Sequence, residues 1–197
     1  MTNDIVKQKI KNFITYNKGV LLFFAAMFGA NIVWKLLISG GEEANAIFLL
    51  GRYDLSHIFD SISEQVAGIT YFFTRLFDSS VMLTKGNVLG ISGGKAVQVV
   101  WSCSGIKQMF VFLVIMIFAS GSWKNKLWFI PIGLIACYFI NIFRTTALTL
   151  LINHNYELFQ FMHHYILKYL YYALIFLLWV VWEECLKNIK LNNKKNV

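Results

Sequence analysis

The stretch LWFIPIGLIACYFINIFRTTALTLLI, residues 127–152, is apolar over most of its length but contains Asn141 and Arg144. About 20 predominantly apolar residues in a helix span the hydrocarbon core of a bilayer, so the stretch predicts a transmembrane helix. Arg144 lies about eight residues from the end of the stretch, which places it about 12 Å below that end of the helix. A charged side chain at this depth is costly and indicates a functional site, although a long side chain can also snorkel to the surface.

The whole chain has the composition of a small polytopic membrane protein. Of its 197 residues, 57% are hydrophobic and 14% are charged, whereas about 25% of the residues in a soluble domain are charged. A soluble fold of this size has too little interior to bury so much apolar surface. The composition also excludes a disordered chain, a collagen-like chain and a small disulfide-rich protein.

Three further stretches are apolar enough to cross a membrane, namely residues 19–38, 105–122 and 166–182. Trp, Tyr and charged residues flank them, as interfacial anchors do. Together with residues 127–152 they predict an all-α polytopic membrane protein with about four transmembrane helices. The sequence contains no internal repeat, and we expect residues 1–197 to form a single membrane domain.

The long segment 39–104 between the first two predicted spans contains two kinds of pattern. Residues 61–77 have a roughly helical apolar spacing with too many polar groups to span a membrane, which predicts an amphipathic helix on the interface. Residues 81–100 contain short β-branched runs separated by glycines, including Gly93-Gly94, and this pattern predicts a small β-hairpin.

The distribution of basic residues predicts the orientation of the chain. The net charge is +8, and Lys and Arg are in excess in the cytoplasmic loops of membrane proteins. The loop 153–165 has no Lys or Arg. Lysines instead precede the first span, occupy the loop 123–126 and follow the last span: Lys7, Lys9, Lys11, Lys18, Lys124, Lys126, Lys187, Lys190, Lys194 and Lys195. We therefore expect both termini in the cytoplasm and the segment 39–104 outside. No nucleic-acid-binding motif accompanies the positive charge, so we expect no nucleic-acid partner.

Cys103 is the cysteine expected at the outer face, because Cys137 falls within a predicted span and Cys185 falls on the cytoplasmic side. It therefore has no intrachain disulfide partner in this arrangement. A lone outer thiol is a small buried residue, an intermolecular bridge or a nucleophile. Cys103 lies at the start of a predicted helix, one turn before Lys107, and both features favour the thiolate and hence a nucleophile.

His163 and His164 lie at the outer end of the fourth predicted span, at the depth expected for Cys103. An imidazole near a thiol can act as general base and then as general acid. Three separate spans thus deliver Cys103, Arg144 and one of these histidines to the same side of the membrane. A zinc site is the competing interpretation, but adjacent residues point about 100° apart on a helix, and no CxxC, HxxxH or HExxH motif is present. We therefore expect neither a metal nor a cofactor.

At these positions the sequence resembles the exosortase/archaeosortase family of membrane-embedded transpeptidases. The matching pieces are Cys103-Ser-Gly105-Ile106 at the start of a helix, Asn141-Ile-Phe-Arg144 in the next helix, and a histidine just before the last one. The glycine-containing hairpin before Cys103 is also similar, and the resemblance covers roughly residues 60–182. The chain looks like a short form with one helix before the core, and Trp101 and Ser102 stand where an acidic residue is common.

The resemblance implies a cysteine protease or transpeptidase that cleaves the C-terminal sorting signal of exported proteins and transfers them to an acceptor. Cys103 would attack the peptide bond, His163 or His164 would take and return a proton, and Arg144 would stabilise the oxyanion. Lys107 and Asn141 are expected to bind the substrate. The implied partners are membrane lipid and exported proteins ending in a short motif, a transmembrane helix and a basic tail. The expected location is the bacterial plasma membrane, with the site facing outward.

Two other kinds of protein remain compatible with the residues alone. A non-enzymatic membrane assembly or transport subunit would need no reactive thiol. A metal or cofactor carrier would use the cysteine and histidines as ligands.

Overall fold

The computed structural model describes residues 8, 16–40, 47–91 and 93–195, although the side chains of Asn153 and of residues 187–195 are not described. Some lysines that predict the orientation lie outside this part of the chain or have side chains outside it: Lys7, Lys9, Lys11, Lys187, Lys190, Lys194 and Lys195.

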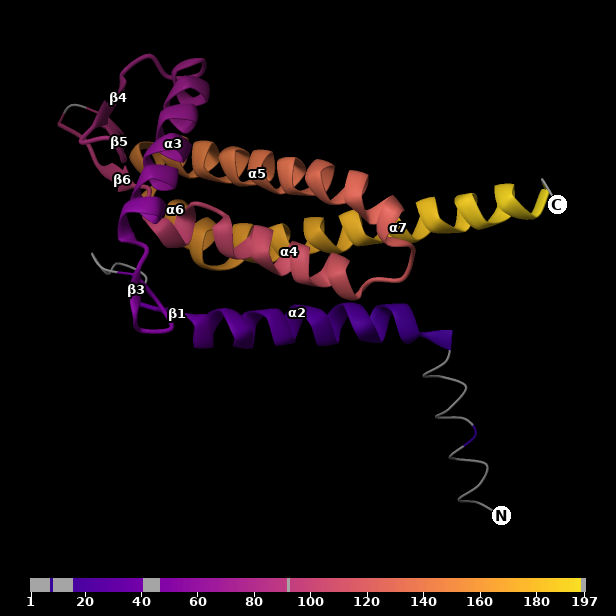
Figure 1. Ribbon diagram of the computed structural model, residues 1–197. Helices are drawn as coiled ribbons and strands as arrows, with labels where there is room; N and C mark the ends of the chain where they lie inside the picture. The colour runs from indigo at the N-terminus through magenta and orange to yellow at the C-terminus, as the bar shows by residue number, and fades with distance from the viewer. Residues whose placement is uncertain (1–7, 9–15, 41–46, 92, 196–197) are drawn as a thin grey trace.

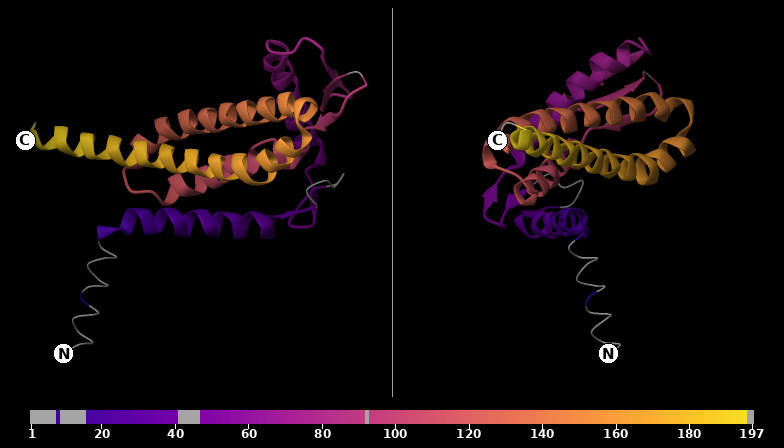
Figure 2. Two further views of the ribbon diagram at one scale, coloured as in Figure 1. Left: turned by 180° about the vertical axis from the view of Figure 1, so that it is seen from behind. Right: turned by 90° about the vertical axis from the view of Figure 1, so that its right-hand side faces the viewer.

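Among the described residues, four helices run side by side, and two small sheets and one further helix gather at one end of them (Figures 1 and 2). The bundle helices are α2 (Lys18–Leu37), α4 (Ile106–Phe118), α5 (Trp123–His154) and α7 (Leu167–Lys195). Helix α2 begins and α7 ends at the end opposite the sheets. We call the end with the sheets the sheet end and the opposite one the terminal end.

In the part of the chain that the structure describes, three helical segments are long and apolar enough to cross a membrane: Lys18–Leu37, Trp123–Ile152 and Tyr156–Leu186. They cover the predicted spans 19–38, 127–152 and 166–182, so the prediction of a mostly helical polytopic membrane protein is confirmed. The predicted span 105–122 differs, because its helix α4 has only 13 residues. Such a helix is about 20 Å long, against a hydrocarbon thickness of about 30 Å.

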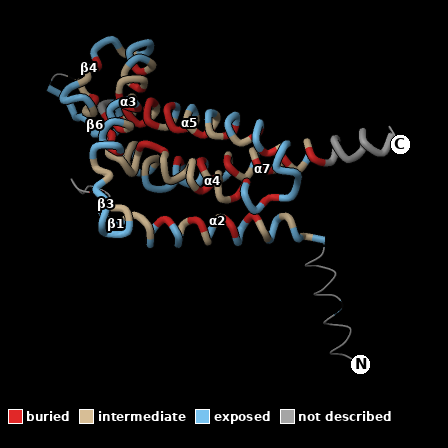
Figure 3. The backbone as a smooth tube through the Cα atoms, viewed as in Figure 1, coloured by how far each residue is buried: buried red, intermediate tan, exposed pale blue. Residues whose placement is uncertain are grey.

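The core of the bundle is formed by large side chains from α2, α4, α5 and α7, including Phe23, Phe112, Ile175 and Trp182. Figure 3 shows these buried positions alternating with exposed ones along the helices, as expected where the outer faces contact lipid. Gly133 lets α4 approach α5 closely, since a β-carbon there would lie 2.1 Å from the Phe112 ring.

Helix α3 (Ser56–Arg75) runs across the sheet end rather than along the bundle (Figures 1 and 2). It starts earlier than the predicted helix 61–77, because Asp54 accepts hydrogen bonds from the N–H and hydroxyl of Ser56. These bonds also lower the pKa of Asp54. On its inner face, Thr70 and Thr145 of α5 share a buried hydrogen bond of 2.7 Å.

The predicted hairpin over residues 81–100 is present and has a third strand. Strands β4 (Val81–Thr84), β5 (Val88–Ile91) and β6 (Ala96–Gln98) form an antiparallel sheet in the order β4-β5-β6. The sequence analysis did not predict the second sheet, which consists of β1 (Ile38–Ser39), β2 (Phe48–Leu49) and β3 (Tyr53–Asp54). Each of its strands has two residues, which is too short for an alternating pattern to show.

The chain reverses direction at the sheet end between α5 and the last helical segment. Asn155 has an extended backbone, and its side chain accepts a hydrogen bond from the Leu158 N–H to start α6 (Tyr156–Phe161). A π-helical turn, η2 (Met162–Ile166), then connects α6 to α7. Both His163 and His164 lie in this turn, and π-helical turns are frequent at functional sites.

Candidate active site

Cys103 lies in a 3₁₀ turn, η1 (Trp101–Cys103), directly before α4. The turn is held by backbone hydrogen bonds from the Cys103 N–H to Val100 and from the Ser104 N–H to Trp101. The Ser104 hydroxyl donates a further bond of 2.6 Å to the Trp101 carbonyl. Cys103 is half-buried, whereas Cys137 is buried in the bundle.

Asn141 fixes the position of this turn from α5. It is fully buried, and its amide nitrogen donates a 2.9 Å hydrogen bond to the Cys103 carbonyl. Gly105, at the start of α4, makes this approach possible. Its φ is +84°, and a β-carbon there would lie 2.8 Å from the Asn141 side chain. The Ser-Cys-Ser-Gly sequence therefore fits a turn that a glycine closes and an asparagine anchors.

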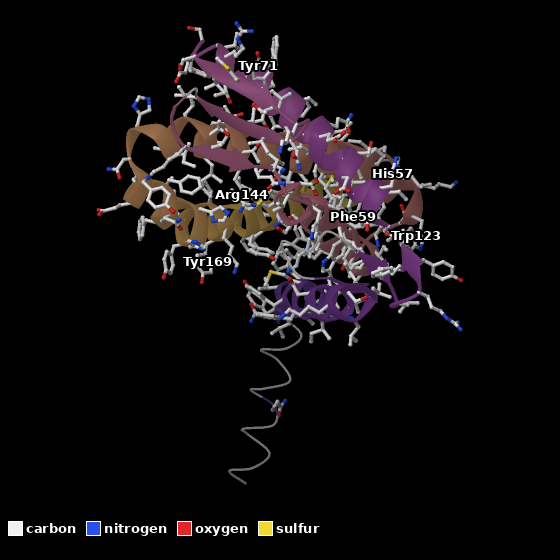
Figure 4. All side chains as sticks on the ribbon, turned by 90° about the vertical axis from the view of Figure 1, so that its left-hand side faces the viewer. His57, Phe59, Tyr71, Trp123, Arg144 and Tyr169 are labelled. Carbon is white, nitrogen blue, oxygen red and sulfur yellow. The ribbon has the colours of Figure 1, made fainter. Side chains whose placement is uncertain are left out.

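Arg144 lies one helical turn after Asn141 on α5 and is half-buried. Viewed from the sheet end in Figure 4, it lies toward the inside of the bundle, whereas the exposed Tyr169 lies at its edge. The Nε atom of Arg144 is buried and has no hydrogen-bond partner among the described residues. A buried N–H without a partner is costly, so this group is available to a ligand.

The two histidines of η2 are oriented by residues of α6. The His163 ring stacks on Phe159, with the ring centres 5.8 Å apart and the planes 2° apart. The His164 Nε2 lies 2.9 Å from the Gln160 Oε1, and the Gln160 amide donates to the Tyr156 hydroxyl. Since Gln160 Oε1 can only accept, His164 carries its proton on Nε2 in this arrangement when the ring is neutral.

These residues border two adjoining cavities. The first, which we call the cationic cavity, has a volume of about 610 Å³ and is lined by Trp34, Lys35, Ile38, Gly40, Trp101, Ser102, Cys103, Lys107, Gln108, Arg144, His163, His164, Lys168 and Tyr172. Cys103, Arg144, His163 and His164 thus share one cavity. Its described lining includes four basic side chains, Lys35, Lys107, Arg144 and Lys168, and no Asp or Glu.

The second cavity, the strand cavity, has a volume of about 760 Å³ and extends from Cys103 along β6 toward α6. Its lining includes residues of α3, β6, α5 and α6. Trp101, Cys103, His163 and His164 border both cavities. Cys103 therefore lies where a cavity with basic side chains meets a cavity that runs along β6.

The helix lengths explain why Arg144 and His163 lie at a similar depth. Arg144 comes ten residues before the end of α5 at His154, and His163 comes eight residues after the turn at Asn155. At about 1.5 Å per residue, both lie roughly 12–15 Å below the sheet end of the bundle. Asn141, which bonds to the Cys103 carbonyl, lies three residues further from that end than Arg144, or about 4.5 Å deeper.

A comparison with protein families matches residues 19–181 to the transmembrane exosortases (Exosortase_EpsH). This chain belongs to the transmembrane exosortase family. Membership implies a role in processing proteins that carry a sorting signal, and the family is generally one of cysteine transpeptidases. The comparisons with curated proteins and with solved structures find no match.

The exosortase fold brings together most of the residues predicted for the site. Cys103, Arg144, His163, His164 and Lys107 all line the cationic cavity. Asn141 is predicted to bind substrate, but it lies behind the turn and uses its amide on Cys103. Within the described residues, no three His, Cys, Asp or Glu side chains gather into a group that could hold a metal ion.

Sequence reasoning did not identify Gln160, Lys35 or Lys168 as residues of the site. Gln160 precedes His164 by four residues, which is a helical spacing and was the available signal. Lys35 and Lys168 lie close to the ends of apolar stretches, where lysines are expected at any membrane interface, so their meeting in one cavity was not predictable.

Proposed function

We propose that this exosortase is a cysteine transpeptidase in which Cys103 is the nucleophile. The observation that carries the proposal is that Cys103, Arg144, His163 and His164, from three separate segments, line one cavity. A thiol, a cation and an imidazole are the groups that acyl transfer through a thioester requires. The cationic surroundings and the start of α4 favour the thiolate form of Cys103.

The reaction begins when the Cys103 sulfur attacks the carbonyl carbon of a peptide bond in the sorting signal. A sulfur–carbon bond forms, and the carbonyl oxygen becomes an oxyanion that Arg144 stabilises. The Nε of Arg144, which has no partner in the described part of the chain, supports this role. The carbon–nitrogen bond then breaks, and a protonated histidine gives its proton to the departing amine.

The resulting thioester is resolved by a second nucleophile, which is an amine, a hydroxyl or water. The histidine, now neutral, takes the proton of this nucleophile as it attacks the thioester carbonyl. The Cys103 thiolate leaves and is ready for the next cycle. His163 or His164 fills this role, and both border the cavity.

Asn141 acts by positioning Cys103 rather than by contacting the substrate, because it is fully buried and bonded to the Cys103 carbonyl. Lys107 lines the cavity and is assigned to substrate binding or to stabilising the thiolate.

The site faces the extracytoplasmic side of the bacterial plasma membrane in this proposal. The sequence places lysines at both termini and in the loop 123–126, and α2 begins and α7 ends at the terminal end. The sheet end is then outside by the positive-inside rule. The bond to be cleaved lies where the transmembrane helix of the substrate emerges.

The test is the processing of a reporter protein that ends in an extracytoplasmic motif, an apolar helix and a basic tail, chosen as one that wild-type cells process. Cys103→Ala is expected to abolish processing while the protein still inserts at wild-type levels. Cys137→Ala is the matched control, because that thiol is buried in the bundle away from the cavities. Continued processing in the Cys103→Ala strain would refute the proposal.

A further inference from the structure

We propose that the peptide segment upstream of the cleaved bond binds as an added β-strand on β6, parallel to it and leading to Cys103. This inference rests on the proposed function and adds the binding mode of the substrate. Hydrogen bonds between the main chains of β6 and the peptide would then guide an extended peptide to the thiol.

Strand β6 is at the edge of its sheet, and its open side borders the strand cavity. The lining residues are consecutive from Ala96 to Trp101, followed by Cys103. Side chains alternate between the two faces of a strand, so a cavity over one face would be lined by every second residue. A consecutive lining indicates that the cavity runs along the backbone edge.

The hydrogen-bond pattern of the sheet shows which backbone groups point to this edge. The Val99 N–H donates to the Asn87 carbonyl at 2.8 Å, and the register pairs Val97 with Leu89. Hydrogen-bonded and non-bonded pairs alternate in an antiparallel ladder. Val97 and Val99 therefore bond to β5, and the N–H groups of Ala96 and Gln98 point toward the cavity.

The strand cavity is lined by β6 on one side and by α6 on another. Just before β6, the Lys95 Nζ lies 3.5 Å from the ring centre of Tyr156 on α6, which connects the sheet to α6. Cys103 and His163 also line the cavity. The volume of about 760 Å³ is within the range of sites that enclose ligands. Strand addition to an exposed edge is a recurring mode of peptide recognition, in which the main chain supplies the hydrogen bonds.

The direction of the added strand follows from the positions that the two parts of the substrate must occupy. The part downstream of the cleaved bond is an apolar helix that enters the bilayer, so the upstream part lies along the sheet. Strand β6 runs toward Cys103. A segment whose carboxyl end reaches the thiol must run the same way, which makes the added strand parallel to β6.

The first test compares Gln98→Pro with Gln98→Ala, using purified protein and the reporter described above. Proline removes the N–H directed at the cavity, and it is tolerated on an edge strand because that N–H does not serve the sheet. Alanine keeps the N–H. We expect kcat/KM to be about tenfold lower for the proline variant than for the alanine variant, as for one lost hydrogen bond. Equal values would overturn strand addition.

The rate at which Cys103 reacts with a small maleimide is measured in both variants and is expected to be the same. This control separates loss of peptide binding from damage to the active-site turn. The outcome is independent of the test of the proposed function, which fails only if Cys103→Ala still processes the reporter.

A cross-linking test gives a second readout that needs no turnover. Ala96→Cys and Gln98→Cys are each placed in a Cys103→Ala background and paired with single cysteines along the upstream segment of the reporter. Parallel pairing predicts that the best partner of Ala96→Cys lies two residues further upstream than that of Gln98→Cys. A reversed order, or cross-linking without a preferred register, would contradict the proposal.

Discussion

Arg144 is unusual both in the sequence, as a charge in an apolar stretch, and in the structure, where its Nε is buried without a partner among the described residues. The sequence places a cation within an apolar stretch. In the structure, Arg144 lines a cavity that the thiol and both histidines also line. Snorkelling to the nearest interface would explain the first observation alone. The shared cavity and the buried Nε, which has no hydrogen-bond partner within the described ranges, favour a role in binding an oxyanion.

We predict that Arg144→Lys reduces kcat nearly as much as Arg144→Ala. A lysine keeps the charge but does not reproduce the planar fork of donors, and loss of one oxyanion donor reduces kcat by about 10²–10³ in other hydrolases. Steady-state kinetics with the reporter measure the effect. Lys168→Arg is the control, because it keeps both charge and donors at another wall of the cavity. Near-wild-type kcat in Arg144→Lys would exclude the oxyanion role.

Separate substitutions determine which histidine acts as the base in the proposed reaction. We predict that either His163→Ala or His164→Ala, but not both, reduces kcat as strongly as Cys103→Ala, because one imidazole is enough to move the proton. If His164 is the base, Gln160→Ala reduces kcat as well, since Gln160 orients that ring. Full activity in both single variants would show that neither histidine is required.

Gly105 is the residue on which the turn at Cys103 depends most directly. We predict that Gly105→Ala destabilises the protein by about 1–3 kcal/mol, because alanine is strained at its φ of +84°. The substitution should also displace Asn141 and slow the reaction of Cys103 with maleimide. Gly29→Ala in α2 is the control, since a β-carbon there meets nothing within 4 Å. Equal thermal stability of the two variants would contradict this account of the turn.

Among the elements, the π-helical turn η2 sets the direction of both histidines. It lies between two regular helices, α6 and α7. The residues after it are therefore rotated about the helix axis, compared with their positions in a continuous α-helix. We predict that deletion of Tyr165, which is exposed, lets the helix close as a regular α-helix. The deletion should abolish processing while the helical content measured by circular dichroism is kept. Retained processing would show that the π-helical turn is not needed.

The elements also show what the sequence could and could not predict. The three long spans follow from apolar length, and the hairpin follows from its glycines. The short α4 did not follow, because residues 105–122 are apolar beyond the point where the helix ends at Phe118. The co-location of Cys103, Arg144 and the histidines was predictable from depth alone, since each lies near the same end of its own span. The anchoring role of Asn141 depends on a tertiary contact with Cys103 and could not be predicted.

At the scale of the whole molecule, the arrangement gives the protein two chemically distinct ends. The terminal end contains the start of α2, the end of α7 and the connection between α4 and α5. The sheet end contains α3, both sheets and the two cavities. A thiol in a cavity near the sheet end is suited, in the proposed reaction, to a peptide bond at the point where a substrate helix leaves the membrane.

This orientation predicts opposite labelling of two introduced cysteines in intact cells, each in a Cys103→Ala background. Met82→Cys, exposed on β4, should react with a membrane-impermeant maleimide. Ser122→Cys, exposed before α5, should react only after the cells are permeabilised. The reverse pattern would place the sheet end in the cytoplasm.

The central claim is that Cys103 carries the substrate as a thioester during the reaction. Mass spectrometry of the enzyme, quenched with acid during turnover of the reporter, tests it most directly. We predict an adduct on the peptide that contains Cys103, equal in mass to the upstream part of the reporter and released by hydroxylamine. Turnover without an adduct on Cys103, together with an adduct on a different residue, would contradict the claim.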